Sequence, residues 1–138
     1  NAVEQCKAAL ALTLEDDVER FATDQNLIDA EGGRSYFLSK EALVVWTMQN
    51  RWTWRDRDIN MNCVSPGPVD TPILGDFIKT LGARAEEDMK VMDRPGAPQD
   101  VAPVVSFALS DHAKWFRGTN LMVDGGMSSH ILSNIHQL

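Results

Sequence analysis

The sequence predicts an α/β fold with a parallel sheet, and two adjacent patterns indicate this. Residues 35–55 have a helical composition, and residues 58–65 alternate between polar and apolar side chains, as in a strand with one buried face. A Pro-Gly-Pro loop ends this strand, and the order helix, strand, loop is half of a β-α-β unit. Ligands bind beyond the carboxyl ends of the strands in such sheets. We therefore expect the loop at residues 66–72 to lie at a ligand site.

Composition and charge indicate one packed domain. The chain has 138 residues, of which 43% are hydrophobic and 24% are charged, as in globular proteins. Its net charge of -7 provides no basic surface for phosphates, which argues against nucleic acid as a partner. Cys6 and Cys63 lie far apart, and no His stands at a zinc-ligand spacing, so we expect reduced thiols, no metal site and a cytoplasmic protein. No apolar run reaches the roughly 20 residues that span a bilayer, so we expect no membrane association.

The N-terminal part, residues 1–32, is predicted to be a helical segment with two short helices. Thr13 is the expected N-cap of the second helix, because acidic residues follow it in the first turn. The acidic side chains of this segment are expected to face solvent rather than to bind a metal, since no His accompanies them. A break at Gly32-Gly33 then precedes the helix at residues 35–55, which we expect to be long and mostly buried.

Four further elements are predicted after the loop. Helices are expected at residues 73–80 and 83–92, where they form either a lid or substrate wall, or plain surface helices. A Pro-Gly turn at residues 94–98 leads into a helix at residues 99–111. A second short strand is predicted at residues 118–126 and ends in a glycine turn. The four tryptophans are expected to lie in the core or in interfaces rather than in a substrate site.

Tyr36 and Lys40 stand four residues apart in a predicted helix, which places a phenol and an ammonium on the same face. An ammonium next to a phenol stabilises the phenolate, and a tyrosine in such a setting can exchange a proton with a carbonyl or alcohol oxygen. The spacing alone is also that of an ordinary amphipathic helix whose Lys covers apolar surface. The remaining motifs favour the catalytic interpretation.

Four motifs follow one another along the chain. They are Tyr36-x-x-x-Lys40, Asn62-Cys63-Val64-Ser65-Pro66-Gly67-Pro68-Val69-Asp70-Thr71-Pro72, Arg94-Pro95-Gly96-x-Pro98-x-Asp100-Val101-Ala102 and Gly118-Thr119-x-x-x-x-Val123-Asp124-Gly125-Gly126. With these motifs, the chain resembles the C-terminal half of a short-chain dehydrogenase/reductase. Residues 1–32 are similar to a helical insertion in the bacterial 3α-hydroxysteroid dehydrogenase/carbonyl reductase group. The resemblance implies an incomplete Rossmann fold, a doubly wound parallel sheet of which residues 33–138 supply only the C-terminal half.

The resemblance also implies the chemistry of the helix motif. Tyr36 is the implied general acid-base, and Lys40 is implied to favour the phenolate while it binds the ribose next to the nicotinamide. The implied cofactor is NAD or NADP. The choice between the two stays open, because the residue that reads the adenosine ribose belongs to the N-terminal half of the fold.

The loop motif is implied to hold the nicotinamide. Pro66 and Gly67 would let the backbone approach the ring. The backbone of Val69 would meet the carboxamide, and the Thr71 hydroxyl would bind the carboxamide or the diphosphate. Asp124-Gly125-Gly126 is expected to support the end of the sheet and subunit contacts rather than catalysis.

Parts of the family pattern are absent. The glycine-rich dinucleotide turn, the Asn-Ala-Gly motif and the catalytic Ser all stand before the Tyr in the family. Either Thr23 takes the place of the Ser or the Ser precedes Asn1, and we favour the second, since Thr23 stands in a polar helical run with no strand before it. We therefore expect a fragment of an NAD(P)-dependent oxidoreductase that interconverts a secondary alcohol and a ketone, hydroxysteroid-like or another carbonyl compound, and that forms a homo-oligomer when complete. The alternative is a non-catalytic interaction module derived from the same scaffold.

Overall fold

The computed structural model describes residues 1–28, 33–81, 87 and 89–137. Its helices and strands are α1 (Ala2–Leu10), α2 (Val18–Asp24), α3 (Arg34–Gln49), β1 (Cys63–Pro66), α4 (Leu74–Leu81), α6 (Pro98–Ala108), β2 (Asn120–Val123) and α7 (Met127–His136), with short 3-10 helices at Arg55–Arg57 and Asp111–Ala113. The strands β1 and β2 pair in parallel, with Cys63 opposite Asn120. The prediction of an α/β fold with a parallel sheet is confirmed.

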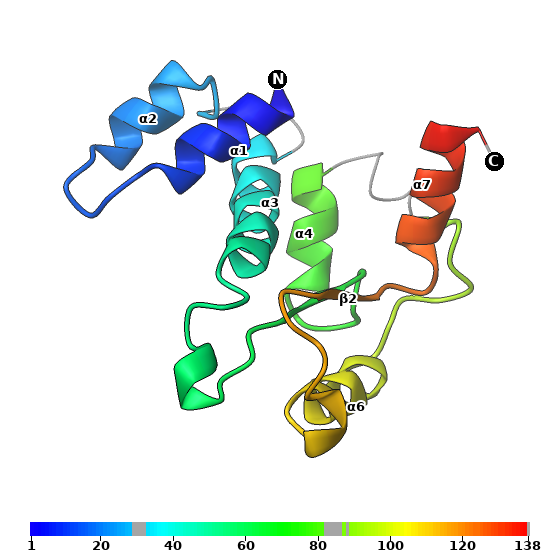
Figure 1. Cartoon of the computed structure of the whole chain (residues 1–138). Helices are drawn as coiled ribbons and strands as arrows, with labels where there is room; N and C mark the ends of the chain where they lie inside the picture. Colours follow the sequence, from blue (N-terminus) through cyan, green and yellow to red (C-terminus); the bar gives the residue numbers. More distant parts are fainter. Residues whose placement is uncertain (29–32, 82–86, 88, 138) are drawn as a thin grey trace.

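The helices lie on both sides of the strands (Figure 1). Helix α6 contacts β1 and β2. Helices α3, α4 and α7 lie across the strands from α6, and α1 and α2 pack beyond α3 at the N-terminal end. The carboxyl ends of β1 and β2 lead into the loop before α4 and into α7. This is the edge at which a sheet of this type binds ligands.

The most buried cluster lies in the helical part of the chain rather than at the sheet. Cys6, Leu27 and Leu38 are buried together, where α1 crosses α3. The half-buried side chains around them are Ala9, Leu10, Phe21, Ala22, Ala42 and Val45. The two short N-terminal helices are as predicted, and their apolar faces anchor α3.

The N-cap of α2 is Asp17 rather than Thr13. The Asp17 carboxylate accepts a hydrogen bond of 2.9 Å from the backbone N–H of Arg20. Thr13 instead donates its N–H and its hydroxyl to Asp16, which closes a separate turn before the helix. The sequence offers several capping side chains in a row, and the position of the turn decides between them.

Helix α3 is shorter and more exposed than expected. It ends at Gln49, where the Asn50 side chain donates to the carbonyl of Trp46 and a tight turn follows. Only Leu38 and Thr47 are buried on this helix. Its apolar side chains surround the helix instead of forming one stripe, so the α1 contact covers only one side of them.

Strand β1 begins at Cys63, five residues later than predicted. The Asn60 side chain donates to the carbonyl of Lys114, and the Asn62 side chain binds the segment before β2 through two hydrogen bonds of 3.0 Å. These side-chain amides add to backbone hydrogen bonds between the two segments, such as the one of 2.7 Å from the N–H of Gly118 to the carbonyl of Met61. Asn60 and Asn62 of the alternating pattern are therefore bridges, whereas Asp58 faces solvent.

The remaining elements agree with the predictions except at the C-terminus. The expected helix at residues 73–80 is α4, the expected helix at residues 99–111 is α6, and the second strand is β2. The helix expected at residues 83–92 falls largely outside the described residues. Helix α7 was not predicted. Among the described residues no helix is long and apolar enough to cross a membrane.

Candidate functional site

Leu38 orients the helix motif. It lies halfway between Tyr36 and Lys40 in sequence, and only 2% of its surface is exposed. Two residues along a helix correspond to a rotation of about 200°, so a buried Leu38 turns both neighbours outward. The side chain of Tyr36 is accordingly 46% exposed, and Lys40 is also exposed. The α3 sequence thus presents the phenol and the ammonium on one open face.

The two side chains of the motif contact each other. The Lys40 Nζ lies over the Tyr36 ring, 5.3 Å from its centroid, in a cation–π contact. In the described part of the chain, neither the Tyr36 hydroxyl nor the Lys40 ammonium has a hydrogen-bond or ion-pair partner. Both groups are therefore available to bind oxygen atoms of a ligand.

Phe77 brings the helix after the loop against this motif. Its ring meets the Tyr36 ring edge-on, with 5.4 Å between centroids, and the Phe37 ring lies 5.7 Å from Tyr36 on the same helix. Helices α3 and α4 stand side by side in Figure 1. The phenol therefore has apolar rings beside it, as a wall for an apolar part of a substrate would require. The sequence predicted α4 but not this contact.

Gly67 lies where the carboxyl ends of β1 and β2 come closest. Its N–H donates to the carbonyl of Val123 over 3.1 Å. A Cβ on Gly67 would lie 2.9 Å from the Cα of Asp124, which is closer than real Cβ atoms approach. The requirement for glycine here comes from the neighbouring strand end. This reason was not foreseen, because the sequence pattern indicated only an approach to the nicotinamide.

Val69 is held by the turn before α6. The N–H of Gly96 donates to the carbonyl of Pro68 over 2.8 Å, and the N–H of Asp70 donates to the carbonyl of Gly96 over 2.7 Å, which makes a parallel bridge between Val69 and Gly96. In this pattern the N–H and C=O of Val69 itself face away from Gly96. The exposed Thr71 donates its hydroxyl to the Val69 carbonyl over 3.3 Å.

An ion pair closes the turn that carries Gly96. The Arg94 guanidinium donates two hydrogen bonds, of 2.7 and 3.0 Å, to the two carboxylate oxygens of Asp100. The Ala97 N–H donates to the same carboxylate over 2.7 Å, at the start of α6. The hydrogen bonds from Arg94 and then from Ala97 lower the pKa of Asp100 to about 2. The carboxylate is therefore ionised at neutral pH.

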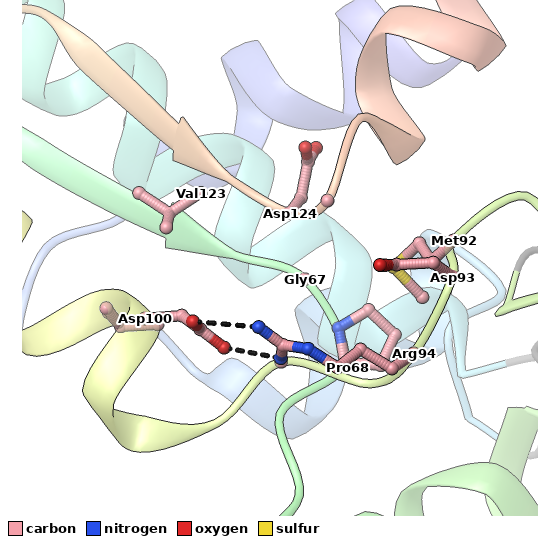
Figure 2. Close-up of a pocket in the computed structure, with 11 residues that line it drawn as sticks. Gly67, Pro68, Met92, Asp93, Arg94, Asp100, Val123 and Asp124 are labelled. Atoms are coloured by element: carbon pink, nitrogen blue, oxygen red, sulfur yellow. Dashed lines mark hydrogen bonds and ion pairs between the residues drawn. The ribbon is translucent and has the colours of Figure 1, made fainter.

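A pocket of about 210 Å³ lies between the strand ends and this turn (Figure 2). It is lined by Gly67, Pro68, Met92, Asp93, Arg94, Gly96, Asp100, Val101, Val123, Asp124 and Gly125. Of the sequence-predicted site residues, only Gly67 belongs to it. Tyr36, Lys40 and Thr71 are not among its lining residues, so the pocket lies apart from the Tyr36–Lys40 pair.

Asp124 lies directly after β2, and its carboxylate binds the start of α7. Its carboxylate points away from the Arg94–Asp100 pair in Figure 2 and accepts hydrogen bonds from the N–H groups of Gly126 and Ser128, at 3.1 and 2.9 Å. Burial raises the pKa of Asp124, but the hydrogen bonds from Ser128 and Gly126 outweigh it and leave the pKa below its ordinary value. The capped segment is the start of α7.

Thr23 lies within α2 and donates its hydroxyl to the carbonyl of Glu19 over 2.9 Å. The hydroxyl is thus bound to its own helix, remote in sequence from the strand ends. This geometry gives no support to Thr23 as a replacement for a catalytic Ser.

The comparisons with known proteins agree with the four motifs. The sequence model of a family described as "Enoyl-(Acyl carrier protein) reductase" matches residues 18–128. The chain belongs to the short-chain dehydrogenase/reductase family. Members of this family are oxidoreductases that use NAD or NADP. The solved 4-hydroxyisoleucine dehydrogenase mutant complexed with NADH and succinate is 27% identical, with a TM-score of 0.59 over 70% of this chain and 40% of that chain. The fold is accordingly part of a Rossmann fold.

Two curated members of the short-chain dehydrogenase/reductase family illustrate the range of similarity. Coniferyl-alcohol dehydrogenase of a Pseudomonas species is 40% identical over 76% of this chain and 41% of its own length. The 3α-hydroxysteroid dehydrogenase/carbonyl reductase of Comamonas testosteroni is 25% identical over 93% of this chain and 51% of its own length. The chain thus spans about two fifths to one half of these relatives.

Proposed function

We propose that this chain provides the C-terminal half of an NAD(P)-dependent oxidoreductase that interconverts a secondary alcohol and a ketone. The observation that carries the proposal is the pair of exposed groups on α3, the Tyr36 phenol with the Lys40 ammonium over its ring. A proton donor and a cation on one open face are what the reduction of a carbonyl requires beside a hydride source. The names of the relatives make a hydroxysteroid-like or another bulky alcohol the preferred substrate class.

The proton is moved by Tyr36. In ketone reduction its hydroxyl donates a proton to the carbonyl oxygen, and in alcohol oxidation the phenolate accepts the proton of the alcohol. Lys40 binds ribose hydroxyls and holds its ammonium over the Tyr36 ring. The bound nicotinamide supplies or accepts the hydride in this chemistry.

The loop after β1 suits the carboxamide of a nicotinamide. Within the described residues the N–H of Val69 has no protein partner, and it faces away from the turn that holds its neighbours. The exposed hydroxyl of Thr71 lies beside it. A backbone donor and acceptor together with a hydroxyl match the amide group of the cofactor. Pro66 and Gly67 bring this segment out from the strand end.

The exposed surface supports the view that these residues are one half of a larger fold. The chain exposes 10127 Å², whereas a compact monomer of 15.3 kDa exposes about 7,100 Å². The excess of about 3,000 Å² lies on this chain alone, so a matching second half would bury about 6,000 Å² in total, as in the largest obligate interfaces. A second half, with the dinucleotide turn and the catalytic Ser, would cover it.

Titration calorimetry with NADH and NADPH tests the proposal on two proteins. One is the 138-residue chain, and the other is the chain extended by the coding sequence before Asn1. We expect the extended chain to bind one cofactor and to oxidise a cyclic secondary alcohol, and the 138-residue chain to bind neither tightly, because the phosphate-binding turn is not among its motifs. Sub-micromolar binding of NADH or NADPH by the 138-residue chain would refute the proposal that this chain is only half of the fold. Binding without turnover of any alcohol or ketone by the extended chain would refute the enzymatic proposal.

A further inference from the structure

The turn at residues 94–98 connects an ion pair to the backbone of the loop after β1. We propose that Asp100 is a positioning residue, which fixes the backbone of Val69 through Arg94 and Gly96. The inference rests on the proposed function only where it assigns Val69 to the cofactor. The mechanical connection itself is independent of any ligand.

The first link is the closure of the turn. The carboxylate of Asp100 binds both ends of it, the Arg94 guanidinium through two hydrogen bonds and the Ala97 N–H through a third. The Arg94 guanidinium also donates to the carbonyl of Pro95 over 3.0 Å. Two parallel hydrogen bonds between planar groups fix direction as well as distance. The conformation of residues 94–97 is thus set by one carboxylate in the first turn of α6.

The second link joins the turn to the loop. Gly96 donates to the carbonyl of Pro68 and accepts from the N–H of Asp70, so it engages the peptide groups on both sides of Val69. With its neighbours held at 2.8 and 2.7 Å, the peptide groups of Val69 have little freedom to rotate. Their N–H and C=O then keep the outward direction that a ligand would meet.

The connection begins at a rigid support. Helix α6 contacts both strands, and Gly67 is bound to β2 on the other side of the loop. Asp100 therefore fastens the middle of the loop to the same scaffold that already holds its start. Figure 2 shows the Arg94–Asp100 pair below the strand ends, with Pro68 beside the Arg94 side chain. Without the carboxylate, the two Gly96 hydrogen bonds would still join the turn to the loop, but the turn itself would no longer be fixed to α6.

The size of the effect follows from the exposure of the pair. The side chains of Arg94 and Asp100 are 57% and 40% exposed, so solvent weakens their attraction. Asp100→Asn keeps an oxygen for the Ala97 N–H and loses the paired charge. Asp100→Ala loses both. We expect the amide hydrogen exchange of Asp70 and Gly96 to accelerate by roughly threefold in the first variant and roughly tenfold in the second.

Amide exchange measured by NMR on the 138-residue chain provides the test. Asp93→Asn is the matched control, because Asp93 lines the same pocket and acts on Arg94 only as a nearby charge, the smallest of the causes that raise the Arg94 pKa, with no hydrogen bond to the turn within the described residues. The expected result is faster exchange at Asp70 and Gly96 in both Asp100 variants, with the amide of Ala42 in α3 unchanged. The control should leave all three amides unchanged.

Two results would overturn the inference. One is exchange at Asp70 and Gly96 that does not respond to either Asp100 variant. The other is equal acceleration at Ala42, which would mean that Asp100 stabilises the fold as a whole rather than this loop. The exchange experiment can fail or succeed independently of the proposed function, because it contains no cofactor. Failure of the extended chain to bind both NADH and NADPH would refute the role of Val69 toward the cofactor and would not alter the exchange result.

Discussion

The substitution Leu38→Ala tests how α3 is held with Tyr36 and Lys40 facing outward. Leu38 is 2% exposed against Cys6 and Leu27, whereas Leu43 on the same helix is 50% exposed. Removing the equivalent of three buried carbon groups costs about 2.4 kcal/mol at about 0.8 kcal/mol each, and the cavity adds to this. The surrounding side chains are small or half-buried and can partly close the space. We expect a loss of about 2.5–3 kcal/mol of unfolding free energy.

Leu43→Ala is the matched control, with the same change on the same helix. About half of its side chain is already in solvent, so we expect a loss below about 1 kcal/mol. Urea titrations followed by far-ultraviolet circular dichroism measure both values on the 138-residue chain. Equal losses for the two variants would refute the reasoning, because the cluster between α1 and α3 would then not be the contact that orients Tyr36 and Lys40.

Two further predictions concern the strand ends and the turn. Gly67→Ala should lower the melting temperature and cost more than about 1 kcal/mol, since its Cβ would lie 2.9 Å from the Asp124 Cα, whereas Gly75→Ala in open space on α4 should stabilise by about 0.5–1 kcal/mol. The decisive result is that the two glycine substitutions change the stability in opposite directions. Hydrogen bonds from Arg94 depress the pKa of Asp100 to about 2, so its stabilisation is present above pH 4 and is lost as the pH falls toward 2. The difference in urea midpoint between the chain and Asp100→Asn should therefore be measurable at pH 5 and much smaller at pH 2, where the Asp100 carboxyl is about half protonated, and a constant difference would contradict this.

The parts of the site that the sequence predicted are those that depend on residues close to one another in the chain. The four-residue spacing of Tyr36 and Lys40 and the Pro-Gly punctuation after β1 depend on neighbours in the chain, so helical periodicity and turn chemistry suffice to find them. The partners of the Asp124 carboxylate are also local, two and four residues onward, but they belong to the start of α7, and the expected support of the sheet end stays a prediction.

The parts that were missed depend on distant contacts. The contact of Phe77 with Tyr36 needs α4 to lie against α3, which no local pattern specifies. The start of β1 moved because the side chain of Asn62 binds a segment more than 50 residues away. The exposure of α3 could not be foreseen either, because burial depends on what packs against a helix rather than on its composition.

The ion pair at the turn was within reach of sequence reasoning. Arg94 and Asp100 were both quoted as part of a motif, and an acidic residue at the third position of a helix commonly binds the backbone at its start. A basic residue just before such a turn is a natural partner for that carboxylate.

The central claim, that Tyr36 transfers the proton, is tested most directly by Tyr36→Phe in the extended chain. The variant keeps the ring and its contacts with Phe37 and Phe77 and removes only the hydroxyl. If Tyr36 transfers the proton, the turnover number for a secondary alcohol should fall by about 10²–10⁴-fold in this variant. The NADH affinity, measured by calorimetry, should stay unchanged. An essential acid-base costs at least about a hundredfold in rate when it is removed. If the variant retained more than about a tenth of the turnover number, Tyr36 would not transfer the proton and would be a packing residue of α3.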